Sequence, residues 1–138
     1  MSNFNQPFLY HFKLTNSNSV INLPYPLEKN KKIKVNSCRY TTASSNNDNV
    51  MIKINGFNDN IYFDGNLIHK CVKVIPLPND QGSQLIYENQ FPDSFDVHIE
   101  ERRQNTGITS LRIEILINLQ NSTDININNP FYLELKIF

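Results

Sequence analysis

The chain contains little of what marks a disulfide-stabilised or nucleotide-binding protein. It has no tryptophan, two cysteines and four glycines among 138 residues. Cys38 and Cys71 are too few for a disulfide framework and fit no metal-binding spacing. We therefore expect both to be free, buried thiols in a reducing compartment. With four glycines and no P-loop, G-x-G-x-x-G or G-x-S-x-G motif, the sequence excludes phosphate-cradling loops.

An excess of one charge and long apolar runs are also missing. Thirteen Lys and Arg balance thirteen Asp and Glu, which argues against a general electrostatic attraction to nucleic acid or to an anionic membrane. No apolar run approaches the ~18 residues that span a bilayer. The first ten residues lack the basic start and apolar stretch of a signal peptide. The sequence therefore predicts a soluble intracellular protein with no membrane partner.

The apolar content that is present is sufficient for one folded domain. Hydrophobic residues make up 39% of the chain, with nine Phe and six Tyr, so the composition is that of a globular protein. A chain of this length usually forms one domain, and no repeat or linker divides it. We expect a single β-sandwich domain over residues 1–138.

Apolar residues recur at every second position along almost the whole chain, which is the period of a strand with one buried face. The predicted strands lie within 8–14, 20–23, 32–36, 51–54, 61–63, 67–75, 95–99, 108–119 and 131–137. Asn55-Gly56 is expected to lie in the longer loop of a hairpin that joins 51–54 to 61–63. The segment 83–89 lacks turn-forming residues in its middle and is compatible with one turn of helix.

Eight or nine short strands without a long amphipathic helix indicate a sandwich or a barrel. Eight antiparallel strands in so short a chain fit best a single jelly roll, in which two four-stranded sheets pack face to face, with at most one short helix. An immunoglobulin-like sandwich is the alternative, disfavoured because the Trp and the paired core cysteines of that fold are absent.

Asparagine is abundant, with 22 residues, and it clusters between the apolar runs. Examples are Asn46, Asn47 and Asn49, and the group at 126–129. Asn tolerates left-handed backbone conformations and caps its own turn. We therefore interpret these clusters as turns between strands.

Few residues suggest a catalytic or metal-binding role. His69 and Cys71 are two positions apart on one predicted strand and could offer two metal ligands, but a structural zinc site needs two more at a recognisable spacing. A second candidate is the acidic group Asp93, Asp96, Glu100 and Glu101. Paired carboxylates can act in acid–base catalysis, but Asp96 alternates with apolar residues and is expected on a solvated strand face. We expect no enzymatic activity, metal or cofactor.

One local excess of positive charge is present. It consists of Lys29, Lys31, Lys32, Lys34 and Arg39. With Tyr40 and Tyr62 as stacking partners, this cluster could bind single-stranded nucleic acid, although the neutral chain predicts weak binding. An exposed strand edge that lysines protect against pairing explains the same residues.

The order of patterns along the chain resembles the penton-type, single jelly-roll minor capsid proteins of virophages (the Sputnik and Zamilon group) and related large DNA viruses. Three segments carry the resemblance. They are the proline-marked 21–27 with strand 32–35, the segment 50–57 after an Asn-rich loop, and the C-terminal strand pair 111–115 and 131–137. Together they cover most of the chain as patterns of residue classes. This chain is shorter than many penton proteins, which often add an insertion domain.

The resemblance implies a non-enzymatic structural protein of the virion capsid, assembled in the host cytoplasm. It implies a position at capsid vertices, contact with the major capsid protein, and a homo-oligomer, with a pentamer favoured. The short length of the chain fits a minimal plug or cement component of the capsid. The expected subunit-contact residues are Phe4, Phe8, Leu9, Tyr25 and Phe91.

Two other functions remain open from the sequence. The first is a single-stranded DNA-binding or replication accessory protein on a β scaffold, carried by the basic cluster. The second is a carbohydrate-binding sandwich, which requires an aromatic platform on one face. Tyr10, Tyr62 and Tyr87 would have to form that platform.

Overall fold

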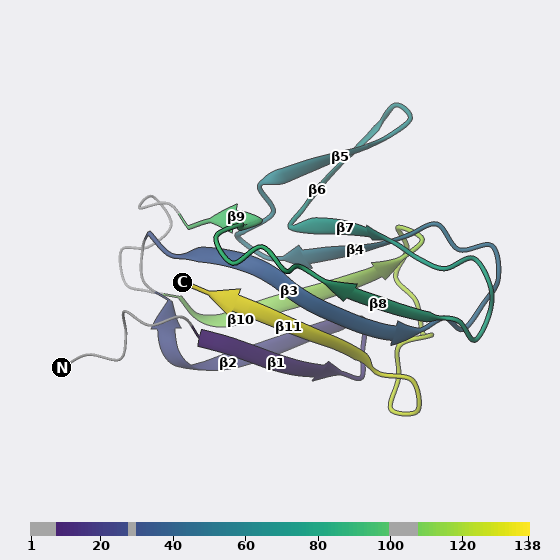
Figure 1. The fold of residues 1–138 in the computed structure, drawn as a ribbon, viewed down its shortest axis with the longest axis horizontal. Coiled ribbons are helices and arrows are strands. Elements are labelled where there is room, and N and C mark those ends of the chain that lie inside the picture. Colours follow the sequence, from purple (N-terminus) through teal and green to yellow (C-terminus); the bar gives the residue numbers. More distant parts are fainter. Residues whose placement is uncertain (1–7, 28–29, 100–107) are drawn as a thin grey trace.

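A computed structural model describes residues 8–27, 30–99 and 108–138. The sequence-predicted Phe4 and Lys29 lie outside these ranges, as does the charged run 100–103. Phe8 is described through its backbone, which begins the first strand and pairs with Ile137. The described strands form two sheets that face each other and a separate hairpin (Figure 1).

Each sheet has four main strands, and every pairing is antiparallel. Sheet A, in spatial order, contains β1 (Phe8–Leu14), β11 (Phe131–Ile137), β3 (Lys32–Thr41) and β8 (Gln84–Glu88), with the short β9 (Val97–His98) also pairing with β3. Sheet B contains β2 (Asn18–Leu27), β10 (Ile108–Ile117), β4 (Asn49–Ile54) and β7 (Lys73–Pro76). The separate hairpin contains β5 (Asn60–Asp64) and β6 (Leu67–Cys71).

The strand order is that of a jelly roll. Without the inserted hairpin and the two-residue β9, sheet A holds the first, eighth, third and sixth strands along the chain, and sheet B the second, seventh, fourth and fifth. This order interleaves the two halves of the chain in both sheets, as the paired Greek keys of a jelly roll require. The predicted fold class is confirmed, and the order differs from that of the immunoglobulin sandwich.

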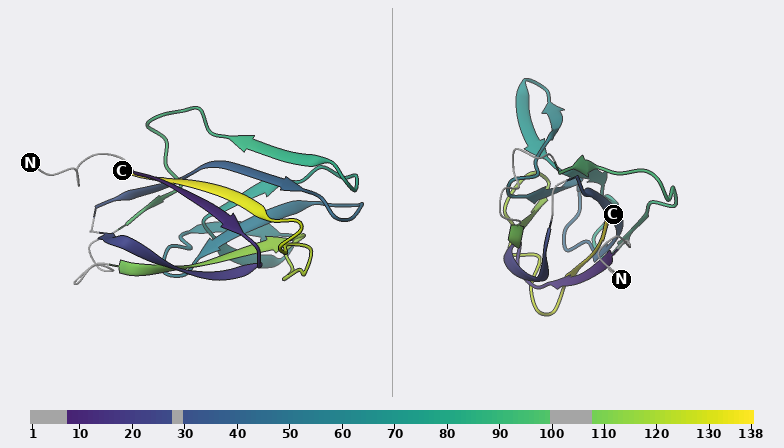
Figure 2. Two further views of the ribbon diagram at one scale, coloured as in Figure 1. Left: turned by 90° about the horizontal axis from the view of Figure 1, so that it is seen from below. Right: turned by 90° about the vertical axis from the view of Figure 1, so that its left-hand side faces the viewer.

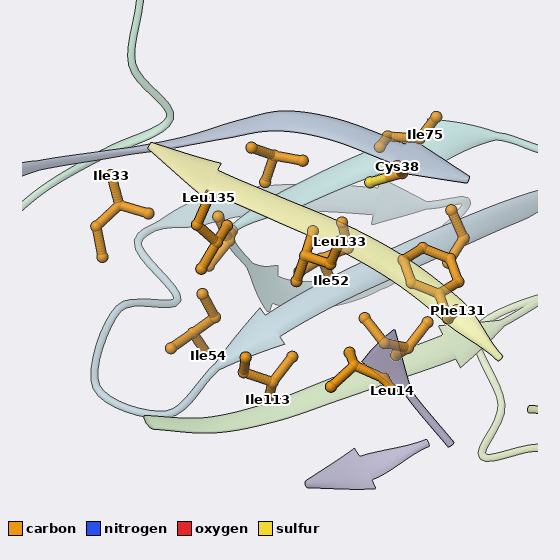
Figure 3. Close-up of a cluster of buried hydrophobic side chains, with 14 of the residues drawn as sticks. Leu14, Ile33, Cys38, Ile52, Ile54, Ile75, Ile113, Phe131, Leu133 and Leu135 are labelled. Carbon is orange, nitrogen blue, oxygen red and sulfur yellow. The ribbon is translucent and has the colours of Figure 1, made fainter. Parts of the chain in front are cut away.

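The core fills the space between the two sheets (Figure 3). Phe131, Leu133 and Leu135 point inward from β11 and meet Ile52, Ile54 and Ile113 from sheet B. Alternate residues of β11 are buried while their neighbours are partly exposed, so the two-residue period of the sequence is the burial period of the strand. Each fully buried Ile, Leu or Phe stabilises the fold by about 1.5–3 kcal/mol.

Strand β3 crosses the centre of sheet A and contains a β-bulge. Its partners on β11 shift between Glu134 and Leu135, so that Asn36 is the extra residue. The bulge changes the phase of the alternation: Val35 points into the core before it, and Cys38 does so after it. Both cysteines are free and buried, as predicted.

Two local predictions are wrong. Strand β4 does not form a hairpin with β5, because β4 pairs with β10 and β7 inside sheet B. Instead β5 pairs with β6 around a Gly65-Asn66 turn. The one turn of helix considered over 83–89 is also absent, because Gln84–Glu88 form β8, in which Leu85 is buried. Neither correction changes the fold class.

The asparagine clusters form turns. Asn30, Asn46 and Asn118 adopt positive φ angles of 66°, 60° and 53°, the left-handed region that Asn tolerates better than most residues. The side-chain oxygen of Asn126 accepts hydrogen bonds from the backbone N–H groups of Asn128 and Asn129, at 2.9 and 3.0 Å. The abundance of Asn therefore has a structural role in the turns between strands.

Candidate functional site

The structure brings two of the predicted contact residues to one face. Leu9 on β1 pairs with Lys136, and Lys136 pairs with Lys34, so these three side chains form a row across the outer face of sheet A. The loop 89–96 crosses this row, because the ammonium groups of Lys34 and Lys136 donate hydrogen bonds to the carbonyls of Phe91 and Pro92. Leu9 and the Phe91 loop therefore belong to the same outer face.

All three contact residues whose side chains are described are solvent-accessible. The exposed fractions are 52% for Leu9, 49% for Tyr25 and 75% for Phe91. None of the three is buried in the core of its own chain. Sequence reasoning missed Val20, an exposed residue of β2.

The loop 89–96 is held in place by a charged pair. Lys73 of β7 and Asp96 lie 2.9 Å apart, with side chains 22% and 11% exposed. The other carboxylate oxygen of Asp96 accepts a hydrogen bond from the backbone N–H of Val35. Burial opposes the charge of Lys73, but Asp96 and the neighbouring Tyr87 outweigh it and raise the pKa of Lys73. The prediction that Asp96 lies on a solvated face is wrong.

The hairpin β5–β6 carries the largest group of exposed apolar side chains on one element of the described chain. We call residues 60–71 the arm. Ile61, Phe63 and Ile68 point to the same side, because Phe63 pairs with Ile68 and Ile61 is two residues before Phe63. Their exposed fractions are 54%, 65% and 62%. The alternation at 61–63 and 67–75 indicated strands, but it did not show that they leave the sandwich.

The basic cluster does not form one accessible patch. Lys34 is 2% exposed, and its pKa is lowered by burial and further by Lys136, while Asp96 and Asp93 act in the opposite direction. Lys32 lies over the rings of Phe95 and Phe138, at 5.2 and 5.9 Å from their centres. Because β3 is an interior strand, its lysines do not protect a sheet edge, and that interpretation is wrong.

The remaining members of the cluster are also separated. Lys31 is partly buried. Arg39 is exposed and stacks on Tyr132, 4.6 Å from the ring centre. It is seven residues from Lys32 along the strand, or roughly 20 Å. Tyr40, a predicted stacking partner, is buried in the core against Phe131, and Tyr62 lies on the arm. The structure thus separates the groups that a nucleic-acid site would need together.

A shallow groove of about 400 Å³ crosses the outer face of sheet A. It contains a contact between His11 and Glu134, with Nδ1 and Oε2 2.9 Å apart. Ser37 also lines the groove, but the pairing order is His11, Glu134, Ser37. Serine and histidine are therefore two strands apart, about 10 Å between backbones, and the acid lies between them. This arrangement is not that of a catalytic triad.

The metal site considered at His69 and Cys71 gains no support from the geometry. His69 and Cys71 do face the same side of β6, toward Tyr62 and Met51. Within residues 8–27, 30–99 and 108–138, no three His, Cys, Asp or Glu side chains gather as metal ligands would. Burial raises the pKa of both the Cys38 and the Cys71 thiol, which makes each a poor nucleophile at neutral pH.

The three tyrosines considered as a carbohydrate platform lie on separate elements. Tyr10 packs on the core from β1, Tyr62 is on the arm, and Tyr87 contacts Lys73 from β8. In the part of the chain that is described, no helix is long and apolar enough to cross a membrane. The sequence matches no protein-family model and no curated protein. The fold and the exposed apolar side chains are therefore the observations on which a function must rest.

Proposed function

We propose that this protein is a non-enzymatic structural component of a virion capsid, a minor capsid protein of the penton type. In this proposal it occupies the vertices, contacts the major capsid protein and assembles in the host cytoplasm. The observation that carries the proposal is the jelly-roll strand order combined with large apolar side chains that remain exposed on the outside of a well-packed core. A contiguous group of exposed apolar side chains, such as Ile61, Phe63 and Ile68 on the hairpin β5–β6, marks a surface that binds other proteins.

A ring of five copies is the arrangement that we propose at the vertex. A ring forms when one contact between two different surfaces repeats until it closes. The protein has exposed apolar residues on well-separated elements, including Leu9 on β1 and Phe63 on β5, so two different surfaces are present on each copy. The neutral net charge favours close approach of identical copies, because no excess charge repels them.

The test is the mass of the purified protein by light scattering over a series of concentrations. The proposal predicts growth from the 16.1 kDa monomer to about 80 kDa, which is five chains. It also predicts passage through a single-stranded DNA resin at moderate salt, because the accessible basic side chains are dispersed. A constant monomer mass together with retention on the resin would instead support the DNA-binding alternative.

A further inference from the structure

The arm is a two-stranded sheet that stands apart from the sandwich. In Figure 1 the hairpin β5–β6 projects beyond β7, and the right-hand view of Figure 2 shows the same projection from another side. Strand β6 lies against β4, and β5 is the outer strand of the arm. A sheet of only two strands is marginally stable in water, so the arm gains stability when another strand pairs with β5.

The outer edge of β5 has backbone groups that the arm itself does not pair. Asp64 pairs with Leu67 across the two-residue turn, so these two residues exchange their backbone hydrogen bonds with each other. Hydrogen-bonded and non-hydrogen-bonded pairs alternate along an antiparallel hairpin. The N–H and C=O groups of Ile61 and Phe63 therefore point away from β6, and no backbone group of the rest of the described chain bonds to them. Both residues are thus open to one more strand.

The inward face of the arm is fixed to sheet B. Tyr62 and Cys71 pack with Met51 of β4 in a second, smaller apolar cluster. At the base of the arm, the Asn60 amide donates a hydrogen bond to the carbonyl of Val72, at 2.7 Å. These contacts hold the arm in one orientation, which lowers the entropic cost of pairing its free edge.

Most edges of the sandwich are protected against pairing, whereas β5 is not. Among the described strands, three of the four edge strands of the sandwich contain lysine or proline, which natural sheets use to protect their edges. These residues are Lys13 on β1, Pro24 and Pro26 on β2, and Lys73 and Pro76 on β7. The sequence of β5 contains neither lysine nor proline. Its open edge is therefore suited to pairing.

The open groups of β5 fit a second copy of the same strand. When two β5 strands run antiparallel around a twofold axis at Tyr62, Ile61 of each copy lies opposite Phe63 of the other. Both pairs are then hydrogen-bonded pairs, so every outward group of the two residues finds a partner. A shift in one direction brings Phe63 opposite Asp59, whose N–H already bonds to the carbonyl of Phe57. A shift in the other direction brings Ile61 opposite the turn. One register therefore satisfies both residues.

The side chains also agree with this register. Each Ile61 faces a Phe63, and a β-branched residue opposite an aromatic one is a favourable cross-strand pair. Ile68 flanks Phe63 on the same face of each arm, so the apolar side chains of the two arms form one continuous block. On the other face Asp64 lies opposite Asn60, and no two like charges face each other. Asn60 is exposed at the base of the arm, which leaves this end of the edge accessible.

The contact is small, because it joins two strands of five residues each. A standard interface uses roughly 20–30 residues from each partner, so a single pair of arms is weakly bound. Pairing is strengthened where several arms pair at once. Five copies in one ring cannot pair their arms two by two, so in the proposed assembly the contact would join arms of different rings.

We propose that β5 of one copy pairs with β5 of a second copy in this twofold register, which joins the two arms into one four-stranded sheet. The partner of the arm is therefore a second copy of this chain, and the contact uses the same surface on both copies. The inference goes beyond the proposed function and is independent of it, because a twofold contact closes after two copies whether or not these copies belong to rings.

The first test is a disulfide that only this register allows. Ile61→Cys and Phe63→Cys proteins are mixed and oxidised with glutathione disulfide, and linked chains of about 32 kDa, twice the chain mass, are measured without reduction. Opposite residues of a hydrogen-bonded pair have Cα atoms about 5.5 Å apart, within the range of a disulfide. The native Cys38 and Cys71 are buried. We expect roughly fivefold more linked chains in this mixture than in either protein alone, or in a mixture of Ile61→Cys with Ile68→Cys.

The second test removes one backbone donor from the edge. Phe63→Pro lacks the N–H that points outward from β5, whereas the matched control Ile68→Pro loses an N–H on the opposite edge of the arm. Both substitutions remove one apolar side chain from the same face of the arm, and circular dichroism checks that both variants are folded. By light scattering over a series of concentrations, the control should reach at least twice the mass of the Phe63→Pro variant.

The outcomes separate this inference from the proposed function. Equal masses of the two proline variants, or no excess of linked chains in the Ile61→Cys and Phe63→Cys mixture, overturn the pairing of β5 and leave the ring as a proposal. Linked chains at the expected positions in a protein that forms no ring of five support the inference and contradict the vertex function. A protein that is monomeric at every concentration and forms no linked chains contradicts both.

Discussion

Tyr40 is the largest fully buried side chain of the described core, and its hydroxyl has no hydrogen-bond partner. The nearby amide of Asn129 donates instead to the carbonyls of Thr41 and Asp124, at 2.9 and 3.3 Å. Burial, together with the charge of Asp124, raises the pKa of Tyr40 to about 12, while the nearby Asn129 amide acts in the opposite direction. The hydroxyl is thus kept in its neutral form inside the sandwich.

The raised pKa of Tyr40 predicts a loss of stability at high pH. Between pH 10 and 12 the unfolded chain releases the phenol proton while the folded state retains it, so the free energy of unfolding falls by roughly 2–3 kcal/mol across this window. Tyr40→Phe removes that part of the pH dependence and leaves stability at pH 7 unchanged or slightly higher. Urea unfolding at a series of pH values measures the free energy of unfolding of the unaltered protein and of the variant. The same fall in this free energy between pH 10 and 12 in both proteins would contradict the prediction.

The pair Lys73–Asp96 gives a second prediction for single residues. Asp96→Asn removes the charge that compensates a largely buried ammonium group, so we expect a loss of about 2 kcal/mol in the free energy of unfolding. Asp93→Asn is the matched control, because the same change is made on an exposed side chain of the same loop. Its effect should stay within about 0.5 kcal/mol. Equal effects of the two substitutions would show that the pair does not anchor the loop.

The arm forms its own unit among the elements of the fold. Its two-residue turn, Gly65-Asn66, joins Asp64 to the directly paired Leu67. Gly65 has a φ of 60°, whereas Asn66 is not among the residues with positive φ, and this combination is typical of a type II′ turn. A side chain at position 65 is strained whatever space surrounds it.

A substitution at this turn should therefore loosen the arm without loosening the sandwich. We expect Gly65→Ala to destabilise the arm by about 1–2 kcal/mol. Hydrogen exchange at 61–70 should accelerate roughly tenfold, with the global unfolding free energy unchanged. Asn66→Ala adds no such strain and should leave the exchange rates as they are. Slower exchange in the Gly65 variant, or a loss of global stability, would show that the arm is not a separate unit.

Most of the strands and the fold class could be predicted from the sequence, because a half-buried strand has apolar residues at every second position. Strand β8 was missed. The pairing partners could not be predicted. The run 67–75 contains two strands that separate at Val72, and one belongs to the arm while the other belongs to sheet B. The periods of both strands are the same, so only long-range pairing distinguishes them. The wrong hairpin at Asn55-Gly56 has the same cause.

Prediction of the site residues from the sequence is limited in a similar way. Exposure of Leu9, Tyr25 and Phe91 agrees with the predicted contact role, but the arm was not predicted, because alternation reports one buried face and Ile61 and Phe63 lie on the other. Lys34 was expected to be accessible as a charged residue. It is buried because the loop 89–96 folds over it, and a local pattern contains no information about a loop almost 60 residues away.

At the scale of the whole molecule, the two opposite flanks are the feature that links fold to function. The jelly-roll order places β7 and β8 on the flank beside the arm, and β1 and β2 on the other. Exposed apolar side chains occur near both flanks, including Phe63 on β5 and Val20 on β2. With no net charge to be screened, the proposed assembly should also persist at high salt, where apolar association is retained or strengthened.

The most direct measurement of the central claim is to image the concentrated, unaltered protein by electron microscopy and to count the copies in each assembly. The account predicts closed rings of five copies. Rings with another number of copies, open filaments or isolated monomers at every concentration would contradict the proposed role at a capsid vertex.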